Sequence, residues 1–262
     1  MKIIVMSDLH YFSGDIENAR FNTNRKLTHF ALPFLEKLTG AVNGDPSVDV
    51  FVNLGDLIQD TRTKEGDLAS LAFGFQLLRK LRCPYYSVLG NHDLKMMDRV
   101  EEAAQFMDHP PCCSVDIKGW HLVFLSPELR PELGTSRGGC YKAQYLGQRT
   151  LAWLQNDLAG NRLPALVFTH YAVAEDPSID DACMFMKDRD ALKGILKADP
   201  NIQAVFSGHL HMCAKYMEDG IPYYLIGSPT DSPMENGIPE GCYCQIETEG
   251  KEVRVTTKTI PL

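Results

Sequence analysis

The chain opens with MKIIVMSDLH (residues 1–10), in which a short apolar run stops at a polar cluster. The run from Ile3 to Met6 is rich in β-branched residues, which predicts a strand. Because no polar residue interrupts the run, the strand is expected to be covered on both faces. Asp8 and His10 follow it directly. The N-terminus therefore predicts a buried strand with a carboxylate and an imidazole at its carboxyl end.

The same arrangement recurs along the chain, where further apolar runs end at polar clusters. These runs are residues 50–52, 85–88, 121–124, 165–168 and 204–206. Between them, helical periodicity appears in Lys26 to Leu38, Leu68 to Leu81 and Gln144 to Leu158. Strands that alternate with amphipathic helices predict the α/β class and a layered sandwich.

The C-terminal part has a different pattern. From Ile221 onward, short β-rich runs are separated by Gly and Pro turns, which predicts antiparallel strands. We find no internal repeat, low-complexity tract or long linker in the sequence, so residues 1–262 are expected to form a single domain. The stretches 126–140 and 171–190 are long for ordinary connections and are candidate substrate-facing loops.

Composition limits the function classes. Hydrophobic residues make up 44% and charged residues 23% of the 262, as in ordinary globular proteins. The formal net charge of -8 disfavours duplex nucleic acid as a partner, because nucleic-acid binding needs clustered cations. A small phosphorylated substrate stays compatible, since bound divalent cations reverse the local potential. No segment approaches the roughly 20 apolar residues of a membrane span, and we expect a cytoplasmic protein.

The eight cysteines are expected to be reduced thiols. The chain has no secretion signal and enough apolar residues for a core, so a disulfide framework is disfavoured. The sequence contains no Cys-x-x-Cys pair, and neither Cys112-Cys113 nor Cys242-x-Cys244 has the spacing of a zinc ribbon. Structural zinc is therefore not expected.

Most of the histidines gather at the ends of predicted strands. The motifs are Asp8-Leu9-His10, Gly55-Asp56, Gly90-Asn91-His92-Asp93, His170 and Gly208-His209-Leu210-His211. The carboxyl ends of strands in an α/β sheet form a crevice, so these side chains are expected to converge. If residues 208–211 stay extended, the spacing of two places both imidazoles on one side and Leu210 toward the core. Carboxylates and neutral imidazoles together are suited to borderline divalent metals.

This ordered set resembles the calcineurin-like metallophosphoesterase family, and the resemblance covers residues 1–228. It implies an α-β-β-α sandwich of two mixed β-sheets flanked by helices, with two divalent ions. Asp56 would bridge the ions, whose identity stays open among manganese, iron, zinc and cobalt. By the resemblance, the first ion would be held by Asp8, His10, Asp56 and His211, and the second by Asp56, Asn91, His170 and His209. Tyr171 departs from the pattern, because many relatives carry a second histidine at that position.

The resemblance also implies a mechanism. A metal-activated water would attack the phosphorus, and His92 would act as the general acid for the leaving group. Asp93 would orient or charge-stabilise His92, or support Asp8 or His10 from behind; a helix N-cap is the alternative. The remaining histidines, His29, His109 and His121, are expected to be structural or solvent-facing.

Several activities share such a metal core. The favoured interpretation is hydrolysis of a small phosphodiester, as in the cyclic nucleotide phosphodiesterase and glycerophosphodiesterase branch. The alternatives are a phosphomonoesterase or a hydrolase of ADP-ribose and related nucleotide diphosphates. A nuclease subunit is disfavoured by the absence of a basic face, and a non-catalytic scaffold by the complete ligand set. The sequence is also compatible with a homo-oligomer.

Overall fold

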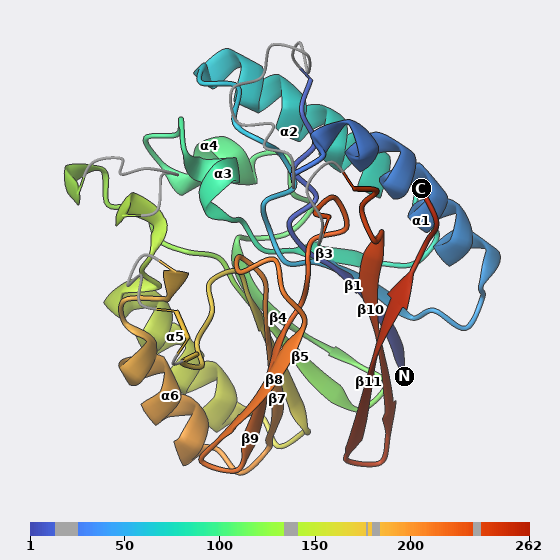
Figure 1. Cartoon of the computed structure of the whole chain (residues 1–262). Helices are drawn as coiled ribbons and strands as arrows, with labels where there is room; N and C mark the ends of the chain where they lie inside the picture. Colours follow the sequence, from blue (N-terminus) through green and yellow to red (C-terminus); the bar gives the residue numbers. More distant parts are fainter. Residues whose placement is uncertain (14–25, 134–140, 177, 180–183, 233–236) are drawn as a thin grey trace.

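The computed structural model describes residues 1–13, 26–133, 141–176, 178–179, 184–232 and 237–262. Two mixed β-sheets pack face to face, and helices cover the outer side of each sheet (Figure 1). The strand order is β11-β10-β1-β2-β3 in the five-stranded sheet and β4-β5-β6-β7-β9-β8 in the six-stranded sheet. The expected α-β-β-α sandwich is confirmed.

The five-stranded sheet is parallel on one side and antiparallel on the other. Its strands are β1 (Lys2–Met6), β2 (Val50–Asn53), β3 (Tyr85–Ser87), β10 (Cys242–Glu249) and β11 (Glu252–Thr259). Ile3 of β1 lies opposite Val50 in the parallel register and opposite Ile246 in the antiparallel register. Helices α1 (Ala31–Gly44) and α2 (Lys64–Leu78) lie over its outer face (Figure 1).

The six-stranded sheet has parallel strands in its centre and antiparallel strands at its edges. Its strands are β4 (Cys112–Ile117), β5 (Trp120–Leu125), β6 (Ala165–Thr169), β7 (Ile202–Ser207), β8 (Ala214–Glu218) and β9 (Ile221–Leu225). Helices α5 (Gly147–Gly160) and α6 (Arg189–Ala198) lie over it (Figure 1). The expectation that the chain is antiparallel from Ile221 onward is wrong for β9, which is antiparallel to β8 but parallel to β7.

The helix boundaries differ from the predicted ones by a few residues. The 3₁₀ turn η1 (Thr28–Phe30) precedes α1, and Pro33 lies in its first turn, where a missing backbone N–H costs little. The hydroxyl of Thr63 accepts a hydrogen bond from Gly66 N at 3.2 Å and so starts α2 earlier than predicted. The short elements are α3 (Asn91–Leu94), α4 (Val100–Ala104), η2 (Pro131–Leu133) and η4 (Tyr141–Ala143). No helix in the described ranges is both long and apolar enough to span a bilayer.

The central strands are buried on both faces, as their unbroken apolar runs predict. In β1, Ile3 and Val5 belong to the core cluster between the sheets, whereas Ile4 and Met6 belong to the cluster that includes the residues of α1. All four side chains are at most 4% exposed. The strand ends are therefore fixed from both sides, which positions the residues that follow them.

A row of stacked rings crosses the layer between the sheets. Phe168 on β6 stacks between Phe124 and Phe206, with ring centroids 5.2 Å apart on each side. The row continues to Tyr224 on β9 at 5.2 Å and to Tyr86 of the other sheet at 4.7 Å. Because Tyr86 belongs to β3, this row joins the two sheets.

His121 has a structural role, as expected. It is the second residue of β5, and its two ring nitrogens lie 2.6 Å from Asp116 and 2.8 Å from Asp157. Asp157 also accepts a hydrogen bond from Ser114 at 2.8 Å. Because Asp157 lies on α5, the cluster fixes the β4–β5 hairpin to that helix.

Phe168→Ala is expected to lower the free energy of unfolding by about 3–5 kcal/mol, because it leaves a cavity in the centre of the ring row. Urea denaturation followed by circular dichroism measures the change. Phe106→Ala is the control, since Phe106 is only partly buried and should lose about 1 kcal/mol. Equal losses for the two variants would contradict the importance of the row.

Candidate metal centre

The polar residues that follow the central strands of both sheets meet at one edge of the sandwich. Asp8 and His10 follow β1, Asp56 follows β2, and Asn91 and His92 begin α3 after β3. From the six-stranded sheet, His170 follows β6, and His209 and His211 follow β7. The structure thus brings the predicted ligands together, as expected for strand carboxyl ends.

Asp8, His10 and His211 form the first group. Nε2 of His10 lies 3.0 Å from Nε2 of His211. Oδ1 of Asp8 lies 3.3 Å from Nε2 of His211 and 3.9 Å from Nε2 of His10. The three ligand atoms therefore face a common point, at a spacing that a metal ion could occupy.

Asp56, His170 and His209 form the second group. Nε2 of His170 lies 3.5 Å from Oδ1 of Asp56 and 3.1 Å from Oδ1 of Asn91. The rings of His170 and His209 lie with their centroids 5.1 Å apart. Tyr171 packs its buried ring against His209, with centroids 4.3 Å apart, in agreement with a packing role.

Asp56 connects the two groups. Its Oδ2 lies 3.7 Å from Nε2 of His10, and its Oδ1 lies 3.5 Å from Nε2 of His170. The side chain is only 2% exposed. One buried carboxylate thus directs one oxygen to each group, which is the arrangement that a bridging ligand requires.

The backbone of this edge is in an unfavourable conformation. Asp8, His10, Asp56, His209 and His211 have φ values of 53°, 52°, 48°, 68° and 52°. Residues with a Cβ rarely adopt this left-handed region, although Asp and His tolerate it better than most. The extended conformation expected for residues 208–211 is therefore wrong, and Leu210 is only half-buried. His209 and His211 turn toward different groups instead of sharing one side.

Gly90 allows the loop after β3 to approach Asp56. A Cβ at Gly90 would lie 2.2 Å from Oδ1 and 2.5 Å from the backbone N of Asp56. Gly208 is similarly confined, because its Cβ would lie 2.6 Å from Oδ2 of Asp8. Any other residue at these positions would displace a candidate ligand.

Hydrogen bonds behind the imidazoles fix their tautomers. Nδ1 of His170 donates to Leu54 O at 2.8 Å, and Nδ1 of His211 donates to Asp231 at 2.7 Å. In the neutral form of each ring, the proton is then on Nδ1, and Nε2 can bind a cation. Ser228 supports this arrangement, since its hydroxyl donates to Asp8 O at 2.8 Å and lies 3.3 Å from Asp231.

His92 contacts a different carboxylate from the one expected. Its Nδ1 donates to Asp60 at 2.8 Å, and Asp60 also accepts from Gln59 at 2.8 Å and from Lys95 at 3.0 Å. The ring of His92 lies edge-on to that of His10, with centroids 4.8 Å apart. The contact that orients His92, predicted for Asp93, is thus made by Asp60.

The Asp93 carboxylate accepts hydrogen bonds from the backbone. It accepts from Gly90 N at 2.9 Å and from Ile58 N at 3.1 Å. The N-cap of α3 is Gly90, and Asp93 is the third residue of the helix, so the predicted N-cap position is wrong by three residues. The two hydrogen bonds of Asp93 fix the loops that carry Asp56 and Asn91. Burial, followed by the nearby charge of Asp56, raises the pKa of Asp93 well above its ordinary value.

Lys26 and Gln59 are further residues of the site that the sequence did not indicate. Nζ of Lys26 lies 3.4 Å from Nδ1 of His10 and 3.3 Å from Oε1 of Gln59. Burial lowers the pKa of Lys26, against the opposing effect of Asp56. Asp60 lies four residues after Asp56 in the sequence, which indicates a second carboxylate on the same loop but not the residue that it contacts.

The site holds both neutral imidazoles and ionised carboxylates. Burial lowers the pKa of His10 and His209 well below the usual value, so both are neutral near pH 7. Burial also lowers the pKa of His211, but Asp8 and Asp231 overcome this effect and raise it to about 9. Burial raises the pKa of Asp8, yet His211 outweighs burial and lowers it below its usual range.

The residues present fit a pair of metal ions. Nε2 of His209 is buried and has no hydrogen-bond partner among the described residues, an arrangement that costs free energy without a ligand. Two further observations also support metal binding: Nε2 of His10 faces Nε2 of His211, and Asp56 has one oxygen near each ligand group.

The predicted substrate-facing loops are only partly described. Residues 134–140, 177 and 180–183 lie outside the described residues.

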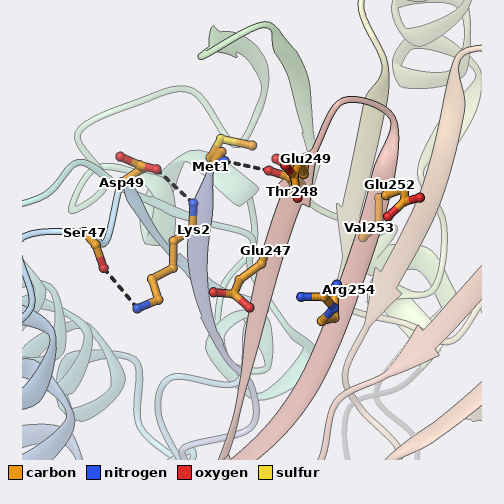
Figure 2. Close-up of a pocket in the computed structure, with 10 residues that line it drawn as sticks. All are labelled: Met1, Lys2, Ser47, Asp49, Glu247, Thr248, Glu249, Glu252, Val253 and Arg254. Atoms are coloured by element: carbon orange, nitrogen blue, oxygen red, sulfur yellow. Dashed lines mark hydrogen bonds between the residues drawn. The ribbon is translucent and has the colours of Figure 1, made fainter.

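A cavity elsewhere does not coincide with this centre. It has a volume of about 660 Å³ and lies at the start of β1 beside the β10–β11 hairpin (Figure 2). Lys2, in its wall, donates through Nζ to Asp45 at 2.7 Å and through its backbone N to Asp49 at 2.8 Å. These groups fix the N-terminus, and the candidate centre lies at the opposite end of β1.

Comparison with known proteins gives a consistent picture. A family model described as calcineurin-like phosphoesterase matches residues 1–213. A probable cyclic nucleotide phosphodiesterase from Colwellia psychrerythraea is 23% identical over 185 residues, which are 70% of this chain and 63% of that protein. A protein of the same description from Psychrobacter sp. is 21% identical over 196 residues, which are 71% of this chain and 54% of that protein. The chain thus spans less than two thirds of the length of these relatives.

A solved structure supports the fold. The crystal structure of a dimetal phosphatase from Danio rerio superposes with a TM-score of 0.74 and 14% sequence identity. The match covers 98% of this chain and 95% of that one. At this identity, the likeness shows a shared fold.

Gly90→Ala is expected to remove bound metal, because the new methyl group would displace Asp56. The metal content of purified protein, measured by inductively coupled plasma mass spectrometry, should fall by at least roughly one ion per chain. Gly194→Ala on α6 is the matched control, since an added Cβ there meets no described heavy atom within 4 Å. Full metal content in a folded Gly90→Ala protein would contradict the role of this close approach.

Metal affinity is expected to rise with pH. His211 has a pKa of about 9 without metal, so below that pH its proton must leave before Nε2 can bind a cation. The affinity should rise about tenfold per pH unit from pH 6 to 8, with release of about one proton. Calorimetric titration with manganese in buffers of different ionisation enthalpy measures both quantities. Asp231→Asn removes one cause of the raised pKa and should flatten the dependence; an affinity independent of pH would contradict the assignment.

Proposed function

We propose that this chain, which belongs to the calcineurin-like phosphoesterase family, hydrolyses a small phosphodiester of the cyclic nucleotide or glycerophosphodiester type. The observation that supports this most directly is the Asp56 carboxylate between His10 and His170. Asp56 lies between the two ligand groups and can contribute one oxygen to each, as a two-metal hydrolase requires.

The described residues would hold two divalent ions. Asp8, His10, Asp56 and His211 would hold one, and Asp56, Asn91, His170 and His209 the other. When bound, such ions supply an activated water as the nucleophile and positive charge opposite the phosphoryl oxygens. Mixed oxygen and imidazole ligands suit manganese, iron, zinc or cobalt.

His92 is proposed as the general acid. Its backbone N donates a hydrogen bond to Oδ1 of Asp56 at 2.8 Å, which holds His92 next to the bridging carboxylate. The side chain is 14% exposed, more than the fully buried His10, and its Nδ1 is held by Asp60. Nε2 is therefore left to donate a proton to the leaving oxygen.

Asp60 is proposed as the residue that positions His92. Burial raises the pKa of Asp60, but the hydrogen bond from His92 and the charge of Lys95 lower it to about 2, so it is ionised at neutral pH. Its charge stabilises the protonated form of His92, whose own pKa is lowered by burial. A bound anionic phosphoryl group would act in the same direction as Asp60.

The substrate class is proposed from the relatives and from the site together. The two relatives described above are both described as probable cyclic nucleotide phosphodiesterases. The alkoxide that leaves must be protonated in diester and monoester hydrolysis alike, so His92 has a function with both, and the names of the relatives favour the diester. Phosphomonoesters and ADP-ribose are alternative substrates for the same ligand set, and the experiments below include them.

With manganese, His92→Ala is expected to lower kcat for a cyclic nucleotide, whose alkoxide leaving group needs a proton, by about 10²- to 10⁴-fold, with little change in metal content. Asp60→Asn should lower kcat by about 10- to 100-fold, because the ring loses its orienting carboxylate. The exposed His29 provides the control His29→Ala, which should retain full activity. If both His92→Ala and Asp60→Asn kept full turnover, the catalytic assignments would be refuted.

A substrate screen tests the proposed class. Metal-loaded protein is assayed for phosphate or nucleotide release from cyclic nucleotides, glycerophosphodiesters, nucleotide sugars, ADP-ribose and simple monoesters. We expect kcat/KM to be highest for one of the first two classes. A preference for ADP-ribose or for monoesters would replace the proposal, and Asp56→Asn should abolish turnover in every case.

A further inference from the structure

Two cysteines lie together where the sheets meet beside the metal centre. Cys213 is exposed and precedes β8 of the six-stranded sheet, whereas Cys242 is buried and begins β10 of the five-stranded sheet. Between them, a Cβ built on Gly227 would lie 3.0 Å from Sγ of Cys213 and 3.2 Å from Sγ of Cys242. The missing side chain of Gly227 thus lets both sulfur atoms approach the same point.

Each cysteine is connected to the first ligand group. Cys213 follows His211 by two residues. Cys242 donates through Sγ to Ser228 O at 3.2 Å, and the Ser228 hydroxyl donates to Asp8 O at 2.8 Å. A change in the distance between the two sulfur atoms would therefore move the segments that hold His211 and Asp8.

We propose that Cys213 and Cys242 are a redox-active pair, which a peroxide converts to a disulfide that links the two sheets and weakens metal binding at His211. The disulfide itself is independent of the proposed phosphodiesterase function, whereas its effect on metal binding rests on that function.

The chemistry balances with hydrogen peroxide as the oxidant. The exposed Cys213 sulfur attacks one peroxide oxygen, the O–O bond breaks, and the products are a sulfenic acid and water. The Cys242 sulfur then attacks the Cys213 sulfur, the S–O bond breaks, and a second water leaves. Two thiols are oxidised to one disulfide while one peroxide is reduced to two waters, and a dithiol reverses the reaction.

The geometry selects this pair over the other described cysteines. Cys112 and Cys113 are neighbours in β4, where successive side chains point to opposite faces. Cys83 is half-buried on the connection before β3, which is separated from β10 by two strands of the same sheet. Cys244 lies in the core between the sheets, two residues beyond Cys242. Among these residues, Cys213 alone combines exposure with a second thiol next to the same glycine.

Peptide mapping tests the disulfide. Metal-loaded protein is treated with hydrogen peroxide, free thiols are blocked with iodoacetamide, and the protein is digested with trypsin and chymotrypsin. Chymotrypsin cleaves after Tyr243 and so separates Cys242 from Cys244. We expect a linked peptide that contains Cys213 and Cys242, that is lost on reduction with dithiothreitol, and that also forms in the control Cys244→Ser.

Metal content tests the coupling. The oxidised protein should lose roughly one manganese ion per chain relative to the reduced protein, and reduction followed by reloading should restore it. Cys213→Ser, at an exposed position, should fold normally and keep its metal after peroxide treatment; Cys242→Ser should behave in the same way.

The outcomes are distinguishable. If no Cys213–Cys242 peptide forms, or if Cys213 links to Cys244 instead, the proposal is overturned. If the disulfide forms while metal content and metal affinity stay unchanged, the coupling is overturned. Because the linkage is measured without substrate, a reduced protein that hydrolyses no phosphodiester would contradict the proposed function but not the disulfide.

Discussion

The carboxylate of Asp56 faces one imidazole from each sheet, and much of the surrounding structure holds it in that position. Its oxygens lie 3.7 Å from His10 and 3.5 Å from His170, in a place where the side chain is almost fully buried. A buried carboxylate without compensating charge is costly, so this arrangement is stable with cations and unfavourable without them. Two glycines allow the loops to pack against the carboxylates, Gly90 against Asp56 and Gly208 against Asp8. Asp93 accepts a hydrogen bond from Gly90 N and so holds the first of these loops in place.

The same constraint accounts for the strained backbone. Left-handed φ values at Asp8, His10 and Asp56, and at both histidines after β7, cost about 1–2 kcal/mol each. Such conformations persist when the surroundings determine them, and here the double-sided burial of β1 and β2 does so. The rigid sandwich thus maintains a loop geometry that an isolated segment would not adopt.

The sequence predicted the central strands because they are buried on both faces and therefore appear as unbroken apolar runs. It also indicated which residues converge, because the ends of parallel strands meet regardless of the loops between them.

The edge strands β4 and β8 were missed, since half-exposed residues weaken their pattern. The short helix α6 was missed as well, because Leu192 and Leu196 are its only fully buried side chains. The direction of β9 was wrong, since side-chain periodicity carries no information on strand polarity. The contact between Asp60 and His92 depends on where the loop after β2 turns, and neither motif nor spacing encodes that.

The division of the ligand groups between two sheets also has a meaning for the order in which the protein is made. Asp8 and His10 are synthesised among the first residues, but the group that they form is completed by His211, about four fifths of the way along the chain. During translation, Asp8 and His10 therefore leave the ribosome long before His211. A nascent chain therefore cannot complete this group before His211 in the second sheet has been synthesised, and an ion that needs all three ligands would bind only after that point.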